Sequence, residues 1–129
     1  GKLYQLLKEY KQAESAFFNA HKLKPSNINI ATQYIMSNSQ SNDGKLTGDS
    51  RKLALNLIKN NKKQAFSIYN VLAIDAYKRE LYDDARSYLH TAKIILTKSN
   101  DIQKNQENLI IIDNMINLVK EKTKLKVKI

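Results

Sequence analysis

Histidine and paired acidic residues are the side chains of this 129-residue chain that could most readily carry acid–base chemistry. His21 and His90 fall on different predicted helices, and neither is accompanied by a serine in an elbow motif. Asp83 and Asp84 stand together at the start of a predicted helix, where carboxylates stabilise the positive end of the helix dipole. Catalysis requires groups that converge on one point. We therefore interpret these residues as structural or surface residues and expect that the chain is not an enzyme.

Cysteine and glycine usage argues against other bound groups. No cysteine occurs, so the sequence excludes disulfides, thiol catalysis and cysteine-based zinc sites. Gly44 and Gly48 lack the spacing and the Lys-Ser/Thr pair of a phosphate-binding loop. The sequence therefore predicts no catalytic residue, no metal ligand and no cofactor.

Net charge is the main compositional feature, at +10 from 22 basic and 12 acidic residues. Such a balance is typical of proteins that bind nucleic acid or anionic lipid. A second interpretation is that lysine is the default surface residue, because the charges are scattered over both faces of the predicted helices. We favour this second interpretation and expect no nucleic acid partner. Lysine recurs almost every second residue from Lys120 to Lys128, and we expect residues 121–129 to form a solvated, frayed tail.

Helical periodicity determines where these residues lie, since apolar and small side chains recur at offsets of about 3, 4 and 7. The predicted helices cover residues 2–7, 10–24, 28–38, 50–59, 65–79, 82–97 and 102–120, with turns at 8–9 and 78–80 and a connector at 60–63. The stretch 37–50 holds two of the three glycines and is predicted to be an extended loop. Ser26 or Asn27 is the predicted N-cap of the helix at 28–38, and Thr47 or Asp49 is the predicted N-cap of the helix at 50–59.

Two segments of the chain share one spacing of small, aromatic and apolar residues. Offsets of 3, 9, 12, 16 and 19 recur in copies that begin at Gly1 and Ala73. The matched pairs are Gly1/Ala73, Tyr4/Ala76, Tyr10/Tyr82, Ala13/Ala85, Phe17/Leu89 and Ala20/Ala92. This pattern resembles the tetratricopeptide repeat, a helical hairpin with a period of about 34 residues. Because Gly1 falls inside such a repeat, we expect the chain to begin within a helix, as a fragment of a longer protein.

The resemblance implies an all-α fold of about three tetratricopeptide hairpins, the first of them truncated, followed by a C-terminal capping helix. The best-formed hairpin runs from Tyr69 to Ala92. The last helix carries one apolar stripe that suits it to cover this hairpin: Leu109, Ile112, Met115, Ile116 and Val119. We assign residues 1–120 to one repeat domain and residues 121–129 to a Lys-rich tail.

A stack of such hairpins offers a concave groove lined by the first helix of each pair. The groove positions combine amide, hydroxyl and apolar side chains, which suit an amphipathic helix or an extended peptide. The predicted peptide-binding residues are Asn29, Thr32, Gln33, Met36, Ser67, Asn70, Ile74, Tyr77 and Lys78. Met36 and Ile74 could equally be core residues, and this alternative stays open. Thr32, Met36 and Ile74 do not fit the groove set of chaperone-clamp domains, so we do not expect a chaperone-tail adaptor.

The middle loop resembles a more specific family. Residues Asp43 to Arg51 are similar to the GxLTGEAR-type segment of the c-type cytochrome biogenesis proteins CcmI or CycH, whose domain also ends fused CcmH proteins and occurs in NrfG. Gly1 and Ala73 lie 72 residues apart, which exceeds two repeats and matches an elongated turn in that family. The third repeat, with Leu81 to Ala85, is similar to the family pattern DYxxAI. The chain departs from the family in its basic charge and in lacking a proline after the second repeat.

This resemblance implies a chaperone-like role in cytochrome c maturation. Family members hold an unfolded apocytochrome c through its C-terminal helix, near the haem lyase complex, while other cytochrome c maturation subunits attach the haem. It also implies a periplasmic domain of a bacterial inner-membrane protein. We expect its membrane anchor in upstream segments, because the longest apolar run in this chain, Leu109 to Ile112, is too short to span a membrane. Two alternatives stay open. One is a generic tetratricopeptide scaffold for envelope, pilus or secretion assembly, and the other is nucleic-acid or lipid binding by the Lys-rich tail.

Overall fold

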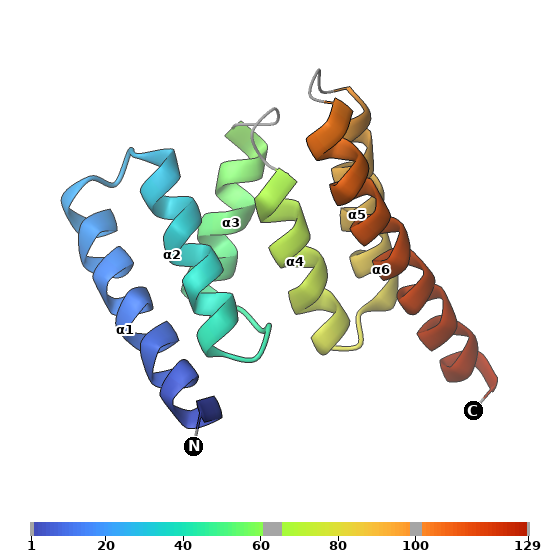
Figure 1. Cartoon of the computed structure of the whole chain (residues 1–129), viewed down its shortest axis with the longest axis horizontal. Helices are drawn as coiled ribbons and strands as arrows, with labels where there is room; N and C mark the ends of the chain where they lie inside the picture. The colour runs from blue at the N-terminus through green and yellow to red at the C-terminus, as the bar shows by residue number, and fades with distance from the viewer. Residues whose placement is uncertain (1, 61–65, 99–101, 129) are drawn as a thin grey trace.

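The computed structural model consists of helices and short connections over the residues that it describes, which are 2–60, 66–98 and 102–128. The helices are α1 (Lys2–Leu23), α2 (Ile28–Ser41), α3 (Gly48–Asn60), α4 (Phe66–Lys78), α5 (Tyr82–Thr97) and α6 (Ile102–Lys128). Consecutive helices run in opposite directions and pack side by side, and α2 also contacts α4 (Figure 1). None of the described residues forms a strand, so the predicted all-α class is confirmed.

Residues 2–23 form one uninterrupted helix, so the predicted turn at Lys8 and Glu9 is wrong. The truncated first hairpin is therefore absent from the described part of the chain. Leucine, lysine, glutamine and alanine dominate this segment, which contains neither glycine nor proline and has a high helix propensity. The turn in the matched C-terminal copy depends on backbone geometry, because Glu80 adopts a positive φ of 64° and Leu81 occupies the N-cap position of a new helix without a side-chain cap. Equal spacing of small residues does not by itself specify a turn.

Helix α2 begins as predicted but ends later. The side-chain oxygen of Asn27 accepts a hydrogen bond from the N–H of Ile30 at 3.0 Å, which confirms Asn27 as the N-cap. The helix continues to Ser41. The predicted loop at 37–50 therefore shrinks to residues 42–47, and the loop prediction is wrong for the segments on either side of them.

Contacts with α1 explain the extra turn of α2. The side-chain amide of Asn38 donates to the carboxylate of Glu14 at 2.9 Å, and the hydroxyl of Ser41 donates to the other oxygen of the same carboxylate. Serine and asparagine have modest helix propensities, so the local sequence does not favour a helix at residues 37–41. Here these tertiary hydrogen bonds outweigh that preference.

The later helices follow the predicted ones closely. The hydroxyl of Thr47 accepts a hydrogen bond from the N–H of Ser50 at 3.4 Å at the start of α3, as predicted for a cap. Helices α4 and α5 match the predicted hairpin to within one residue at each end. Helix α6 continues past Lys120 to Lys128, where the sequence predicts a frayed tail. Gly1 and most of the 60–63 connector lie outside the described residues.

Two apolar clusters hold the helices together. The larger cluster joins α4, α5 and α6, and its alanines let these helices approach closely: Ala73, Ala76, Ala85, Leu89, Ala92, Leu96, Ile112, Ile116 and Val119. The second cluster joins α2, α3 and α4 with a loop residue: Ile35, Leu46, Ala54, Ile68, Val71 and Leu72. The ring of Tyr88 packs against both clusters and so connects them.

Helix α6 covers α5 with the predicted apolar stripe. Ile112, Ile116 and Val119 are buried in the larger cluster, and Leu109 and Met115 pack beside them. No helix in the described ranges is both long enough and apolar enough to cross a bilayer.

Candidate functional site

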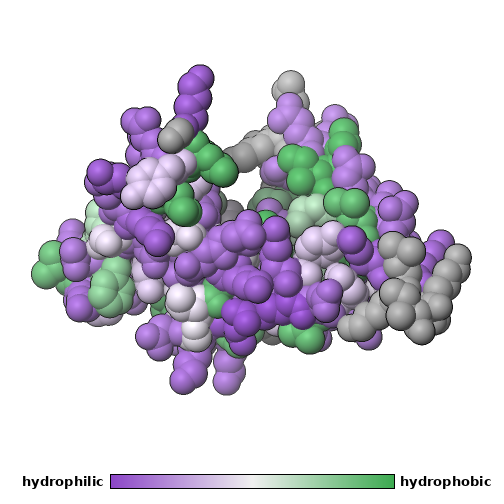
Figure 2. Space-filling view, turned by 90° about the horizontal axis from the view of Figure 1, so that it is seen from below, coloured by the Kyte–Doolittle hydropathy of each residue, from purple (hydrophilic) through white to green (hydrophobic). Residues whose placement is uncertain are grey.

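The predicted peptide-binding residues lie on the accessible sides of α2 and α4, two helices that contact each other. We call the following set the groove face: Asn29, Thr32, Gln33 and Met36 of α2, with Ser67, Asn70, Ile74 and Tyr77 of α4. Seen from below, the molecular surface has a notch between the N-terminal and the C-terminal helices, with hydrophobic side chains on both flanks (Figure 2). Helices α2 and α4, which carry the groove face, lie between α1 and α6 (Figure 1).

The α2 half of the groove face is mostly polar. Asn29 and Gln33 are exposed and free to contact a ligand. The hydroxyl of Thr32 donates to the carbonyl of Ile28 at 2.8 Å within the same helix, so its hydrogen is already used. Met36 is half-buried and packs beside the second apolar cluster, so it has a partly structural role.

The α4 half is half-buried throughout. The side-chain oxygen of Asn70 is buried and has no hydrogen-bond partner within the described ranges. An unpaired buried acceptor costs free energy, so this amide is a position where a ligand donor would be favourable. The ring of Tyr77 packs edge-on against Tyr82 at 5.8 Å between ring centroids. Lys78, the remaining predicted peptide-binding residue, is exposed and forms an ion pair with Asp43 at 3.7 Å.

An apolar cavity of about 100 Å³ adjoins the α4 half of the groove face. We call it the α4–α6 cavity, and its lining residues are Ala73, Ile74, Tyr77, Leu89, Met115, Leu118 and Val119. Ile74 is therefore neither a fully buried core residue nor a free surface residue. Sequence reasoning missed the contribution of Met115 and Leu118 to this site. The signal that could have revealed it is the spacing of Ile111, Met115 and Leu118 by four and three positions. This spacing makes a second apolar stripe on α6 beside the core stripe.

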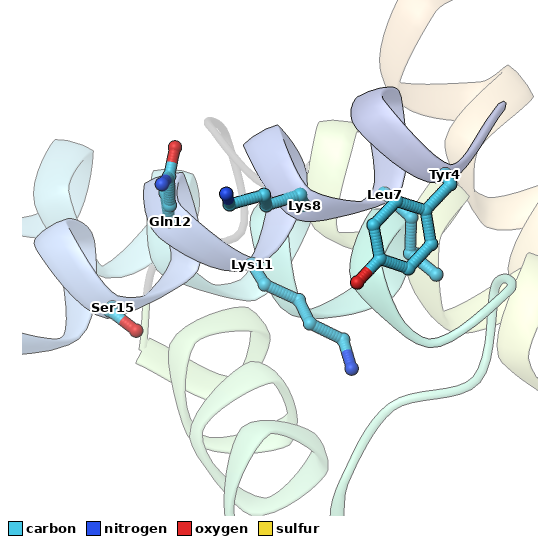
Figure 3. A pocket seen from close by; sticks show the side chains of 6 residues that line it. All are labelled: Tyr4, Leu7, Lys8, Lys11, Gln12 and Ser15. Atoms are coloured by element: carbon cyan, nitrogen blue, oxygen red, sulfur yellow. The ribbon is translucent and has the colours of Figure 1, made fainter. Parts of the chain in front are cut away.

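A wider hollow of about 450 Å³ lies against α1. Its lining residues all belong to this helix: Tyr4, Leu7, Lys8, Lys11, Gln12 and Ser15 (Figure 3). Tyr4 is 76% exposed and Leu7 is 40% exposed. Because the described residues supply no opposing wall, this hollow is an open surface and not a site with convergent groups.

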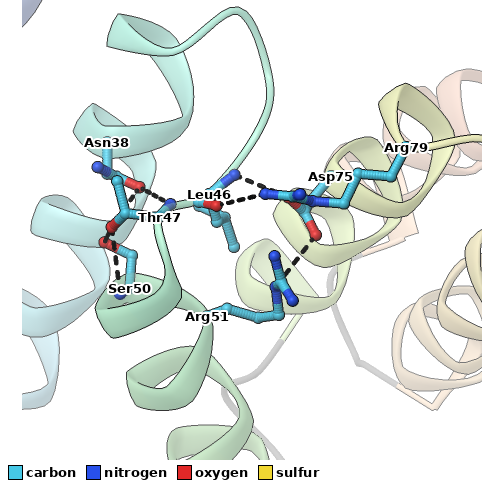
Figure 4. A network of polar contacts seen from close by, with 7 residues as sticks. All are labelled: Asn38, Leu46, Thr47, Ser50, Arg51, Asp75 and Arg79. Carbon is cyan, nitrogen blue, oxygen red and sulfur yellow. Dashed lines mark hydrogen bonds and ion pairs between the residues drawn. The ribbon is translucent and has the colours of Figure 1, made fainter.

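The 42–47 loop is fastened to α4 by a buried carboxylate (Figure 4). Asp75 is only 4% exposed, and its Oδ1 accepts hydrogen bonds from the N–H of Leu46 at 2.7 Å and from Nε of Arg79 at 2.9 Å. Arg79 also donates to the carbonyl of Leu46 at 2.8 Å. Nε of Arg51 lies 3.5 Å from the other carboxylate oxygen, an ion pair without hydrogen-bond geometry. The 42–47 loop is thus held in one position beside the groove face.

Asn38 fastens the same loop to α2 (Figure 4). Its side-chain oxygen accepts a hydrogen bond from the N–H of Thr47 at 2.9 Å, while its amide group donates to Glu14 of α1. Asn38 is fully buried, so these partners satisfy a side chain that would otherwise be costly to bury. One amide therefore joins α1, α2 and the start of α3.

The candidate acid–base residues lie apart from one another. The ring of His21 on α1 stacks on Tyr34 with 6.2 Å between centroids, whereas His90 is exposed on α5. Asp83 forms an ion pair with Arg86 at 3.1 Å in the first turn of α5. Across the described ranges, no group of three His, Asp or Glu side chains could hold a metal ion.

Comparison with known proteins adds no relative to this description. No protein-family model matches the chain, and no curated protein or solved structure is significantly similar to it.

Proposed function

We propose that this chain is a protein-binding module, not an enzyme, and that its groove face holds an amphipathic helix. The observation that supports this most directly is the α4 row of half-buried residues beside the α4–α6 cavity. Amphipathic helices bind grooves by inserting apolar side chains at helical spacing.

The packing order of the helices supports a tetratricopeptide-type arrangement. Helix α4 pairs with α5, α6 packs on α5, and α2 contacts both α3 and α4. In such an array the first helices of successive pairs line one face, which here are α2, α4 and α6. The groove residues and the α6 wall of the cavity belong to these three helices.

We further propose that the bound helix is the C-terminal helix of an apocytochrome c. This step depends on the resemblance of the Asp43–Arg51 segment to the CcmI/CycH family. Leu46 and Thr47 of that segment hold the loop against Asp75 and Asn38, next to the groove face. The module would then present the apocytochrome in the periplasm to the other cytochrome c maturation subunits, which carry out the haem chemistry.

The test is calorimetric titration of the chain with synthetic C-terminal helix peptides from c-type cytochromes of the same organism, with scrambled peptides as controls. We expect saturable binding of at least one native peptide and none of its scrambled form. Ile74→Asp should weaken binding while the helical circular dichroism stays unchanged. The matched control is Leu55→Asp, on an exposed position of α3 outside the groove face.

Two results would overturn the proposal. Absence of binding for every cytochrome peptide would remove the proposed partner. Unfolding of the Ile74→Asp variant, with Leu55→Asp still folded, would assign Ile74 to the core and remove it from the groove face.

A further inference from the structure

The C-terminal turns of α6 carry a sequence pattern that is not helical. Lysine alternates there with threonine, leucine and valine, and we call this stretch the alternating segment: Lys122, Thr123, Lys124, Leu125, Lys126, Val127 and Lys128. Strict alternation over about 4–8 positions is typical of a β-strand with one apolar face, and threonine and valine favour strands. The structure nevertheless has a helix through Lys128. Such a conflict between local pattern and structure is expected at functional segments.

The alternating segment extends α6 beyond the part that the core holds. Val119 is 2% exposed and belongs to the larger apolar cluster, whereas residues 120–122 and Lys124 are exposed. Thr123 is half-buried, and its hydroxyl donates to the carbonyl of Val119 at 2.9 Å within the same helix. The C-terminal turns of α6 project away from the other helices (Figure 1). Packing therefore does little to fix the conformation of this segment.

A helix and a strand distribute the lysines of this segment differently. In a helix, residues two apart are separated by about 200° around the axis, so the lysine positions fall in two rows on opposite sides. In a strand, residues two apart lie on one face, so all the lysines would share one face and the residues between them the other. Like charges gathered on one face repel, which disfavours the strand in the free protein. A surface of opposite charge would remove this repulsion and shift the segment toward the strand.

The charge and the two faces of such a strand define the chemistry of its partner. From position 120 to 128 the chain has five lysines and one glutamate. None of the ion pairs between described side chains involves Lys120, Lys122 or Lys124. The lysine face therefore requires an array of negative charges, and the opposite face requires an apolar layer beside them. An anionic bilayer surface supplies both, whereas a nucleic acid backbone supplies only the charges.

We propose that the alternating segment is a membrane-contact switch, helical in the free protein and an amphipathic strand on an anionic lipid surface. The strand lies at the level of the headgroups, with its lysine face toward their phosphates and its other face toward the acyl chains. At this level water still reaches the backbone, so an unpaired strand does not leave its polar groups unsatisfied. This inference goes beyond the proposed function and does not depend on the groove face, because the alternating segment lies outside it.

The chain has no cysteine, so site-directed spin labelling can test the switch directly. Single cysteine substitutions at positions 120–128 each carry a nitroxide, whose collision rates with oxygen and with a water-soluble nickel complex report its depth in lipid. The probes are vesicles of phosphatidylglycerol and phosphatidylcholine in equal parts, with pure phosphatidylcholine vesicles as the neutral control. We expect the rates to vary with a period of about 3.6 residues in buffer and of about 2 residues on the anionic vesicles. A period of about 3.6 on the anionic vesicles, or no lipid contact at all, would overturn the switch.

A sequence swap separates the strand from a simple basic tail. Lys124→Leu combined with Leu125→Lys keeps composition and charge but breaks the alternation, and it should weaken binding to the anionic vesicles about tenfold. Binding as tight as that of the wild type would show that charge alone matters and would overturn the strand.

Charge is tested by Lys124→Gln, which should weaken vesicle binding about fivefold at low salt and less at high salt. Lys52→Gln is the matched control, because Lys52 is an exposed lysine of α3, and it should bind as the wild type does. Equal losses for the two variants would contradict a contact through the alternating segment. Tighter binding of duplex DNA than of the vesicles, with no effect of the swap, would replace the lipid surface by nucleic acid.

Discussion

The N–H of Leu46 donates to the buried carboxylate of Asp75 at 2.7 Å, and this bond joins a loop residue to the middle of α4. Arg79 completes the arrangement by donating to both Asp75 and the carbonyl of Leu46. Both backbone polar groups of Leu46 are therefore satisfied although the residue is only 1% exposed. The loop can accordingly bring an apolar side chain into the second cluster without leaving unpaired backbone groups.

Replacing Asp75 by alanine should destabilise the domain strongly. The substitution leaves the buried N–H of Leu46 without an acceptor and removes the partner of Arg79, which should lower the free energy of unfolding by about 2–3 kcal/mol. Urea unfolding followed by circular dichroism measures this. Asp83→Ala is the control, because its carboxylate is 86% exposed in the pair with Arg86 and should change stability by less than about 1 kcal/mol. Equal losses for the two variants would contradict the structural role of Asp75.

Alanine substitutions at Gly44 and Gly48 should have opposite effects on stability. Gly44 has a φ of +89°, and a Cβ there would lie 2.9 Å from Cγ2 of Ile74. An L-residue in this backbone region costs about 1–2 kcal/mol, so Gly44→Ala should destabilise. Gly48 opens α3 and a Cβ there would meet nothing within 4 Å, so Gly48→Ala should stabilise by about 0.4–1 kcal/mol. Chemical denaturation of both variants tests the pair, and effects of the same sign would contradict the loop geometry.

The helices could be predicted from the sequence where an apolar stripe ended at a strong local break. Helix α5 and the core stripe of α6 meet this condition, and the structure has both as predicted. The end of α2 could not be predicted, because Asn38 is held by Glu14, a partner 24 residues away that local propensity does not include. The turn at Lys8 and Glu9 was inferred from spacing alone, and no backbone signal supported it.

The candidate site was predictable on α4 but not on α6. A helical period was enough to group Asn70, Ile74 and Tyr77 on one side of α4, which is half-buried. Leu118 was missed because the last helix was considered only through its core stripe. The coupling of Leu46 to Asp75 was also missed, since it joins residues 29 positions apart and depends on how the loop folds back.

Glycine substitutions at Glu9 and Glu80 should separate a helix interior from a true turn. Glu9 lies inside the continuous α1, where glycine costs about 0.8–1.0 kcal/mol relative to alanine. Glu80 has a φ of 64°, a conformation that glycine adopts readily. We expect the free energy of unfolding of the Glu80→Gly variant, measured in urea, to exceed that of the Glu9→Gly variant by about 1 kcal/mol. A more stable Glu9→Gly variant would restore the predicted turn at residues 8–9.

Stability at alkaline pH should depend on Tyr88. Burial raises the pKa of the Tyr88 phenol above its ordinary value of 10.0, and the negative charges of Asp84 and Asp75 add to this effect. The folded state therefore favours the neutral phenol. This contribution is complete below the pKa of the unfolded chain and is lost as the pH rises through the higher pKa of the folded state.

Urea unfolding at a series of pH values on either side of 10.0 should show a steeper loss of stability for the wild type than for Tyr88→Phe. Tyr4→Phe, at a position that is 76% exposed, should keep the wild-type slope. Parallel slopes for all three proteins would remove Tyr88 as the source of the alkaline dependence.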